Sequence, residues 1–398
     1  MPQLLYKTKN SFPNLSSTFW FFFSLLIVLK PSCQATQSLP NSRLLNAYKA
    51  LQAWKHAIIS DPNNITSNWY GEKVCNYTGV FCTFALDDPH ITTVAGIDLN
   101  GKDIAGSLPE ELGLLTDIAL FHLNSNRFGG TIPKSFFNLH LLYELDISNN
   151  CFTGSFPSVI LSLPSLKYLD LRFNEFEGSV PSTLFDLKLD AIFLNDNKFQ
   201  SSIPNNIGNS PASVIVLANN KFTGGIPCSL AKMGGTLNEI SLMNMSLNGC
   251  LPREIGELTN LTIFDVSFND LVGPLPEMTG GMKDLEEFNV AHNKLSCKIP
   301  ASLCSLPRLA NLTYSYNYIS GESPKCYNIA GKEDRQNCIP GRPWQRSAQE
   351  CKSFVAHPLN CANFGYSAIS PSPSPAVASL MLSPVYLDDQ DDLTNVIH

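Results

Sequence analysis

The chain has 398 residues, of which 44% are hydrophobic and 15% charged, so it can bury a large core and is not an intrinsically disordered polyelectrolyte. Its 27 basic and 34 acidic residues give a formal net charge of −7, which excludes a general nucleic-acid-binding protein, because such proteins need a basic face. Twelve cysteines are too few for a disulfide miniprotein and too many for most cytosolic enzymes. A secreted protein with a sizeable core remains.

Residues 1–35 have the features of a secretory signal peptide. Lys7 and Lys9 form a basic start, residues 19–29 are an apolar run, and Ala35 precedes the expected cleavage point. The run is too short to span a bilayer, which needs about 20 apolar residues. Because no later apolar run is long enough either, we expect a secreted, extracellular chain with no membrane span.

Residues 36–83 are predicted to form an N-terminal cap. Ser42 can cap a helix that ends near Pro62. The apolar residues at helical spacing on one face of this helix are Leu44, Leu45, Tyr48, Leu51, Trp54 and Ile58. Cys75 and Cys82 should then close a small disulfide loop beside the first coil.

Residues 84–325 repeat a pattern at intervals of 23 to 25 residues. Each unit closes with a proline, at positions 109, 133, 157, 181, 204, 227, 252, 276, 300 and 324. Residues 166–181, LKYLDLRFNEFEGSVP, show the pattern, which resembles the plant type of leucine-rich repeat. Because each coil buries its apolar edge only against its neighbours, ten copies predict an α/β solenoid. We therefore expect a leucine-rich-repeat superhelix with a helical N-terminal cap and a disulfide-tied C-terminal tail.

An asparagine ends the strand of most repeats. It stands at positions 126, 150, 174, 197, 220, 269, 293 and 317, whereas Met245 takes its place in one coil. The residues five and three positions before it should point into the core, and the intervening ones should point outward. The buried amide can satisfy backbone groups that leave the sheet, so we expect an asparagine ladder from coil to coil.

The cysteines predict a stapled C-terminal end. Residues 326–362 contain Cys326, Cys338, Cys351 and Cys361, which we expect to form two bridges that tie down the last coil. Two further pairs, Cys228 with Cys250 and Cys297 with Cys304, are candidates for local bridges, although the sequence does not determine the connectivity.

Loss of Cys33 with the signal peptide would leave an odd number of cysteines. Cys151 has no obvious partner and is the first candidate for the unpaired thiol, which is compatible with a covalent homodimer. Residues 363–398 lose the periodicity, with alternating Ser and Pro at 370–375 and acidic residues at 388–392. We expect a disordered Ser-Pro and acidic tail there.

The sequence contains no pattern of catalytic residues. Phosphate-binding and dinucleotide-binding glycine motifs, a serine nucleophile motif and a His-Glu-x-x-His motif are all missing. The seven histidines have no metal-ligand spacing, and the cysteines form no Cys-x-x-Cys pairs. We therefore predict a protein that is not an enzyme and uses no metal or cofactor.

The repeat register also predicts which side chains line the outward face of the strands. Carboxylates and aromatic rings alternate there, and the candidate binding residues are Glu144, Asp146, Tyr168, Asp170, Phe173, Phe193, Asp196, Glu239, Asp265 and Phe268. Carboxylates on neighbouring strands, such as Asp146 and Asp170, lie about 5 Å apart and repel each other. A cationic partner would relieve that repulsion, so we predict a site for a basic peptide or small basic protein. The alternative interpretation is that these residues only keep the face soluble.

Five Asn-x-Ser/Thr sequons predict glycosylation of a secreted chain. They begin at Asn64, Asn76, Asn244, Asn260 and Asn311. Glycans on Asn244 and Asn311 would project onto or beside the outward face of the strands, which favours the first six coils as the binding region.

The cap motif and the cysteine tail resemble the plant leucine-rich repeat extensins over residues 45–362. The most specific part of the resemblance is the cap, with Trp54-Lys55, Asn68-Trp69 and the segment from Val74 to Cys82. The resemblance implies a cell-wall protein that dimerises and captures basic cysteine-rich peptides of the rapid alkalinization factor type. Such proteins link cell-wall formation and cell expansion to signalling.

One short Ser-Pro stretch stands where that family has long Ser-Pro-Pro-Pro-Pro arrays, which predicts a relative without a long extensin domain in the apoplast. Cell-wall pectin is a second candidate partner. The alternative function is inhibition of microbial cell-wall-degrading enzymes, because polygalacturonase inhibitors also have about ten such repeats and no membrane anchor. Those inhibitors lack the four-cysteine tail and the cap motif.

Overall fold

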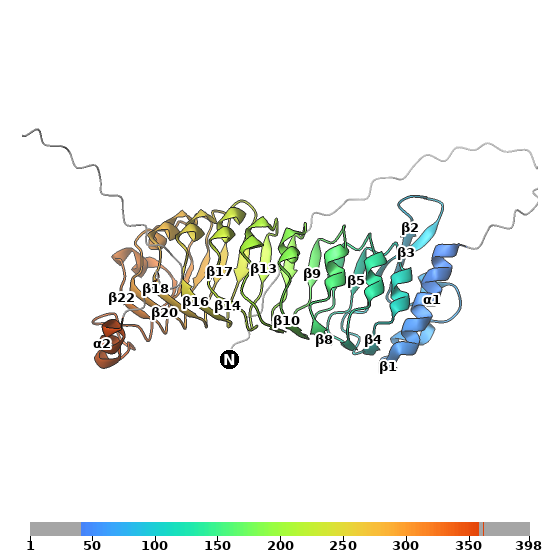
Figure 1. Cartoon of the computed structure of the whole chain (residues 1–398), viewed down its shortest axis with the longest axis horizontal. Helices are drawn as coiled ribbons and strands as arrows, with labels where there is room; N and C mark the ends of the chain where they lie inside the picture. Colours follow the sequence, from blue (N-terminus) through green and yellow to red (C-terminus); the bar gives the residue numbers. More distant parts are fainter. Residues whose placement is uncertain (1–40, 358–360, 362–398) are drawn as a thin grey trace, which may run out of the picture. The chain divides into compact units, whose positions relative to one another are not determined.

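The computed structural model describes residues 41–357 and residue 361. The expected signal peptide, Cys33 and the Ser-Pro and acidic tail lie outside the described residues. The described chain winds into successive coils, each with a short strand on one side and, in most coils, a short 3₁₀ helix on the other (Figure 1). This arrangement confirms the predicted leucine-rich-repeat solenoid.

One sheet of twelve strands runs the length of the coils in the described part of the chain. The first pair is antiparallel and all later pairs are parallel. In order, the strands are β2 (Val80–Phe84), β3 (Thr92–Asp98), β5 (Leu120–His122), β7 (Glu144–Asp146), β9 (Tyr168–Asp170), β11 (Ala191–Phe193), β13 (Val214–Val216), β15 (Glu239–Ser241), β17 (Ile263–Asp265), β19 (Glu287–Asn289), β21 (Asn311–Thr313) and β23 (Gly331–Glu333).

A second row of strands forms where each coil turns, and it divides into two sheets. The six-stranded sheet contains β1 (Ile58–Ser60), β4 (Ala105–Ser107), β6 (Arg127–Gly130), β8 (Cys151–Ser155), β10 (Glu175–Gly178) and β12 (Lys198–Phe199). The five-stranded sheet contains β14 (Thr223–Gly224), β16 (Ser246–Cys250), β18 (Asp270–Pro274), β20 (Lys294–Lys298) and β22 (Tyr318–Gly321). An isolated bridge between Ser202 and Thr223 joins the two.

The repeat prolines explain where the 3₁₀ helices begin. Eight of these helices start directly after a repeat proline, such as Pro181 with φ −63°. Proline suits that position because its φ is fixed and the helix start needs no backbone donor. The 3₁₀ helices are η1 (Ile65–Asn68), η2 (Val74–Asn76), η3 (Glu110–Leu114), η4 (Lys134–Asn138), η5 (Ser158–Ser162), η6 (Ser182–Asp186), η7 (Asn205–Asn209), η8 (Cys228–Met233), η9 (Arg253–Glu257), η10 (Glu277–Gly281), η11 (Leu303–Ser305) and η12 (Pro324–Asn328).

The asparagine ladder forms as predicted. Asn174, for example, accepts a hydrogen bond from the backbone N–H of Phe152 at 3.0 Å and donates to the carbonyls of Ile147 and Leu171 at 3.0 and 3.2 Å. Each ladder asparagine therefore binds its own coil to the preceding one. Met245 is buried at the missing step, and Asn337 adds a step beyond Asn317 that the repeat pattern did not reveal.

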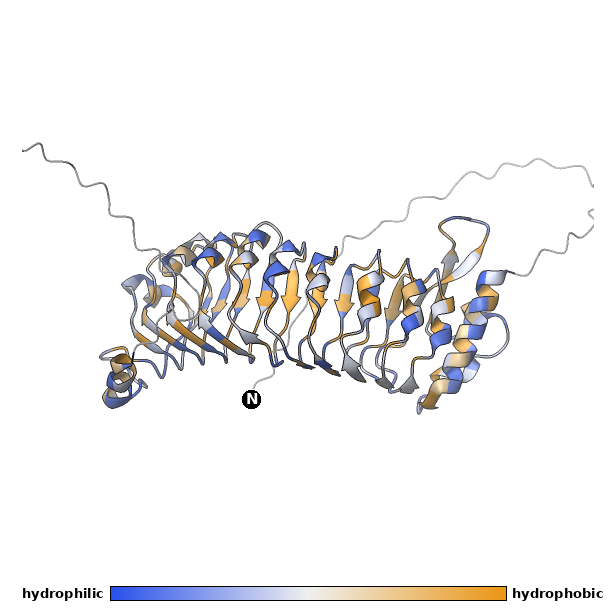
Figure 2. Cartoon of the chain, viewed as in Figure 1, coloured by the Kyte–Doolittle hydropathy of each residue, from blue (hydrophilic) through white to orange (hydrophobic). Residues whose placement is uncertain are grey.

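The N-terminal cap is built on helix α1 (Ser42–Ala57), in which orange and blue residues alternate around the helix (Figure 2). The capping side chain is that of Asn41, not Ser42, because its Oδ1 accepts from the backbone N–H groups of Arg43 and Leu44. Trp54 is fully buried, and its ring centroid lies 5.5 Å from that of Phe121 in the first repeats.

Two further details of the cap differ from the sequence prediction. The helix ends at Ala57, five residues before Pro62, because the chain enters strand β1 there. Leu45 is 37% exposed, while Ala47 and Ala50 are buried in its place. The predicted disulfide between Cys75 and Cys82 is confirmed.

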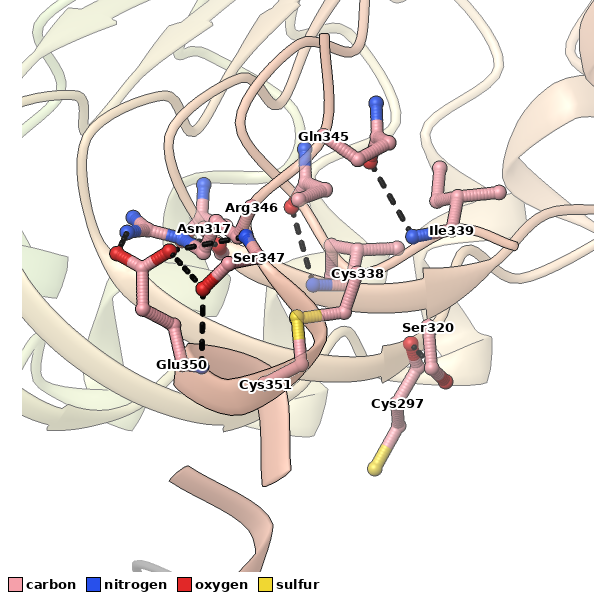
Figure 3. The surroundings of a disulfide bond; sticks show 12 residues. Cys297, Asn317, Ser320, Cys338, Ile339, Gln345, Arg346, Ser347, Glu350 and Cys351 are labelled. Carbon is pink, nitrogen blue, oxygen red and sulfur yellow. Dashed lines mark hydrogen bonds and ion pairs between the residues drawn. A yellow bond between two sulfur atoms is a disulfide. The ribbon is translucent and has the colours of Figure 1, made fainter. Parts of the chain in front are cut away.

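The C-terminal cap extends the long sheet by one strand. Strand β23 pairs with β21, and helix α2 (Ala348–Ala356) follows it. Figure 3 shows the Cys338–Cys351 disulfide beside the start of α2, where the side chains of Ser347 and Glu350 form a capping box. The expected pair of bridges within the tail is wrong, because Cys326 bonds Cys304 and Cys361 bonds Cys250, and both of these partners lie in the coils.

The local bridges Cys228–Cys250 and Cys297–Cys304 do not form, so both predictions are wrong. Cys228 opens η8, whereas Cys250 ends strand β16, and the two therefore occupy different sides of adjacent coils. Cys250 instead bonds Cys361, 111 residues further along the chain. Gly273 makes room for this bridge, since a Cβ there would lie 2.6 Å from the Cys361 Sγ.

The number of unpaired thiols also differs from the prediction. Cys151 is free and exposed, as expected, and Cys228 and Cys297 are free and exposed as well. The odd thiol is thus one of three among the described residues.

Candidate functional site

The open face of the twelve-stranded sheet presents the first and third residues of each short strand. The middle residue of each strand, such as Leu145, Leu169 or Ile192, is buried in the core. This alternation follows from the two-residue period of a strand, and it makes the open face a regular grid of side chains. Adjacent strands place their first residues about 4.8 Å apart.

The N-terminal half of the open face contains predicted residues that are largely neutralised by their neighbours. His122 Nε2 lies 3.0 Å from Glu144 Oε2, and Arg172 Nε lies 2.9 Å from Asp170 Oδ2. The Arg172 guanidinium also covers the ring of Phe193, 5.0 Å from its centroid. This half therefore offers a cationic ligand fewer unpaired carboxylates than its sequence indicates.

Asp170 is buried rather than exposed, with a relative exposure of 0%. Burial and the neighbouring Asp146 raise the pKa of Asp170 to about 7, and Arg172 only partly offsets them. Asp146 itself accepts hydrogen bonds from the backbone N–H and the hydroxyl of Ser148. Tyr168 donates its hydroxyl to Asp170 at 3.3 Å, and burial raises the pKa of this phenol. Asp146 and Asp170 therefore repel each other as predicted, although Asp170 is itself buried.

The C-terminal half contains a group of carboxylates with no cation beside them. Glu239 begins strand β15 and Glu287 begins strand β19, and each is half-buried. Ile263 of strand β17 lies between them, in register with both. Neither glutamate carboxylate forms a side-chain hydrogen bond or an ion pair with another described residue.

The pKa values of these glutamates reflect their surroundings. Burial and then the charge of Glu287 raise the pKa of Glu239, while burial and then Asp265 raise the pKa of Glu287. Burial also raises the pKa of Asp265, although this residue accepts hydrogen bonds from Ser267 and Asn289. We call Glu239, Ile263 and Glu287 the acidic saddle.

The remaining predicted residues lie at the edge of the open face, just before each ladder asparagine. Asp196 accepts hydrogen bonds from Asn195 and Asn219 at 2.8 and 2.9 Å. Phe173 and Phe268 are 46% and 48% exposed. The predicted residues thus form separate groups at the N-terminal half, the edge and the saddle, and they do not converge on one pocket.

The structure also shows residues of interest that are not among the candidate binding residues predicted from the sequence. Ile263 and Glu287 complete the acidic saddle, and the register of the first strand residue places both on the open face. Near the N-terminal end of the open face, Phe81, Leu120 and Tyr143 are exposed apolar residues. Gly96 lies between Phe81 and Leu120 in the pairing of β2, β3 and β5.

The sequon asparagines are accessible in the structure. Asn64, Asn76, Asn244 and Asn311 are exposed and Asn260 is half-buried. Asn311 is in register with Glu287, so it lies on the open face beside the acidic saddle. The described residues contain no group of three or more potential metal ligands and no helix that is long and apolar enough to cross a membrane.

Comparison with family models defines the class of the protein. Residues 45–83 match the leucine rich repeat N-terminal domain, and residues 118–176, 142–199 and 284–306 match leucine rich repeats. The matches agree with the cap and coils described above. The chain is a leucine-rich-repeat protein.

Individual relatives narrow the class further. The chain is 68% identical over 338 residues to leucine-rich repeat extensin-like protein 7 of Arabidopsis thaliana, across 84% of this chain and 78% of that protein. It is 63% identical over 339 residues to extensin-like protein 6 of the same plant, across 84% and 72%. The chain therefore belongs to the leucine-rich repeat extensin-like family, as its cap motif and cysteine tail indicate.

Solved structures of plant receptor ectodomains share the fold. The Arabidopsis receptor kinase HAESA, in complex with the peptide hormone IDA and the co-receptor SERK1, matches with a TM-score of 0.60 and 26% identity, over 73% of this chain and 53% of that chain. The plant peptide hormone receptor RGFR1, in complex with RGF2, matches with a TM-score of 0.55 and 26% identity, over 62% and 44%.

Proposed function

We propose that this chain is a secreted cell-wall protein that captures a basic, cysteine-rich signalling peptide on the open face of its long sheet. In this role it modulates cell-wall formation and cell expansion, and it acts by binding rather than by catalysis. Membership of the extensin-like family supports the location, and four disulfides fit an oxidising compartment. The ectodomains of HAESA and RGFR1, which bind peptide hormones, support a peptide ligand.

The acidic saddle is the observation that carries the proposal. Two partly desolvated carboxylates lie two strands apart, about 10 Å, with an apolar residue between them. An arginine or lysine of the ligand would rest its aliphatic stem on Ile263 and place its charge about 5 Å from both carboxylates. Because the two glutamates lack a cation within the described structure, the ligand gains their attraction without breaking an existing ion pair.

Charge-neutral variants of the saddle test the proposal. The mature chain, secreted from a plant host, is titrated with a synthetic peptide of the rapid alkalinization factor type by calorimetry at several salt concentrations. Glu239→Gln with Glu287→Gln should weaken binding about 10- to 100-fold and flatten its salt dependence. Glu144→Gln is the matched control, because Glu144 also begins a strand but already has His122 as its partner, and it should change binding less than about threefold.

Two outcomes would contradict this function. In the first, the double variant binds the peptide as tightly as the natural chain. In the second, the natural chain does not bind the peptide but inhibits fungal polygalacturonases, which would favour the alternative of an inhibitor of cell-wall-degrading enzymes.

Variant Asn311→Gln checks the location of the binding site, because a glycan beside Glu287 would obstruct the acidic saddle. Removal of this glycan should therefore tighten binding of the peptide.

A further inference from the structure

A continuous column of side chains runs along one edge of the open face. Its members are the residues that directly precede the ladder position in six successive coils: Asp196, Asn219, Asn244, Phe268, His292 and Tyr316. All six have left-handed backbones, with φ between 51° and 58°. Because they share one backbone conformation at one repeat position, their side chains leave the coils in parallel, about 4.8 Å apart. We call this set the edge column.

Neighbours in the edge column touch each other. Asn219 Nδ2 donates to Asp196 Oδ1 at 2.9 Å, and Asn244 Nδ2 donates to Asn219 Oδ1 at 2.8 Å. At the other end, the ring centroids of Phe268 and His292 lie 4.0 Å apart, and those of His292 and Tyr316 lie 4.1 Å apart. The column therefore consists of a hydrogen-bonded polar half and a stacked aromatic half.

The polar half and the aromatic half of the edge column meet between Asn244 and Phe268. One face of the Phe268 ring is covered by His292, yet the side chain remains 48% exposed. Because the column side chains leave successive coils in parallel, we infer that the opposite face of the ring is the one nearer to Asn244, one coil away. Asn244 is itself exposed and begins the sequon Asn244-Met245-Ser246, whose hydroxyl-bearing Ser246 is also exposed.

We propose that Asn244 carries an N-linked glycan whose first N-acetylglucosamine stacks on the open face of Phe268 and so continues the aromatic column. Attachment forms a bond between Asn244 Nδ2 and the anomeric carbon of the sugar. It breaks the bond from that carbon to the diphosphate of a lipid-linked oligosaccharide donor, and the diphosphate leaves as the amide loses one proton. The remaining Nδ2 hydrogen still donates to Asn219.

Stacking is favourable because the C–H-rich face of the sugar ring removes exposed aromatic surface from water. The inference does not rest on peptide binding, since it concerns the edge of the face and not the acidic saddle. The proposal also changes the interpretation of Phe268. The sequence suggested this residue as a contact for the peptide, whereas here its ring contacts a glycan. The attached sugar would form a fixed wall at that edge of the open face.

A thermodynamic cycle with a matched control tests the stacking. The full chain is secreted from a plant or insect host, and mass spectrometry measures glycan occupancy at Asn244. Ser246→Ala removes the sequon but keeps the Asn244 amide. Phe268→Ala should lower Tm by about 1–2 °C more in the glycosylated chain than in the Ser246→Ala background.

Phe173→Ala is the control, because Phe173 has the same backbone position and a similar exposure, while the residue at this position of the preceding coil, Asn149, begins no sequon. Its effect on Tm should be the same in both backgrounds. As a second measurement on the unmutated chain, the N-acetyl methyl signal of the Asn244 glycan should shift upfield relative to that of the Asn64 glycan, owing to the aromatic ring current. An unoccupied Asn244, additive changes in Tm or an unshifted methyl signal would overturn the proposal.

Discussion

The two halves of the open face are built from the same repeat, but they differ in whether their carboxylates have partners. In the N-terminal half, Glu144 lies beside His122 and Asp170 pairs with Arg172. In the C-terminal half, Glu239 and Glu287 have no such partner among the described residues, and burial raises their pKa values. The same strand repeat therefore holds either carboxylates with partners of their own or carboxylates that retain their attraction for a cation.

The difference lies in one side chain per coil. Arg172 follows strand β9 by two residues, and its guanidinium folds back over Asp170 and Phe193. The equivalent residue after β17 is Ser267, which donates hydrogen bonds to Asp265 but brings no charge. A repeat with arginine thus pairs its strand carboxylate with a cation, whereas the repeat with serine gives Asp265 hydrogen bonds without a countercharge.

The largest expected effect concerns the pH dependence of the N-terminal half. The pKa of Asp170 is about 7 in the folded chain and about 3.9 in an unfolded one, so the folded state binds more protons between these values. Relative to Asp170→Asn, the unfolding free energy of the natural chain should therefore rise as pH falls from 8 to 4, by up to about 4 kcal/mol. Urea unfolding across this pH range measures the difference.

Asp284→Asn provides the matched control for this experiment. Asp284 pairs with Arg308 at 3.0 Å on the exposed surface, so its variant should track the natural chain within about 0.5 kcal/mol at every pH. If the unfolding free energy of the natural chain relative to Asp170→Asn fell as pH fell, the ion pair with Arg172 would dominate over burial, and the contrast between the halves would be larger.

Removal of the guanidinium should have the next largest effect. Arg172→Ala leaves the Asp170 carboxylate buried without its cation, so we expect a loss of about 2 kcal/mol of unfolding free energy at pH 8. The loss should shrink at pH 5, because Asp170 is then protonated in the folded state. Arg308→Ala, which breaks an exposed pair, should cost about 0.5 kcal/mol or less. Equal losses for the two variants at pH 8 would show that Arg172 does little for Asp170.

The repeat pattern predicts the backbone well because it acts through simple rules. The asparagine ladder and the buried middle residue of each strand follow from spacing alone, as Asn174 and Leu169 illustrate. The last strand, β23, was missed because the segment around Lys332 lacks the apolar residues of the repeat. Asn337, twenty residues after Asn317, was the remaining signal of an additional coil.

Side-chain partners were harder to predict because they depend on contacts across coils. The sequence does not show that the chain returns Cys361 to Cys250, or that Arg172 turns back onto Asp170 instead of extending outward. The same limitation affected the candidate site: the acidic residues were correctly assigned to strand positions, but their neutralisation by neighbours was not foreseen. The first six coils were favoured, whereas the unpaired glutamates lie in later ones.

The smallest expected effect comes from a variant that places a cation in the C-terminal half of the open face. This variant tests the contrast between the two halves most directly. Ile263→Lys would place an ammonium group between Glu239 and Glu287, as an internal copy of the proposed ligand charge. Ile263→Met, of similar length but neutral, is the control for lost packing. At pH 7 the lysine variant should be more stable than the methionine variant by about 0.5–1 kcal/mol, and the difference should shrink as falling pH protonates both carboxylates. The lysine should also lower the pKa values of both glutamates, measured by NMR titration, and abolish binding of a basic peptide.

If the lysine variant were less stable than the methionine variant at pH 7, with unchanged pKa values, the two carboxylates would not share a cation site.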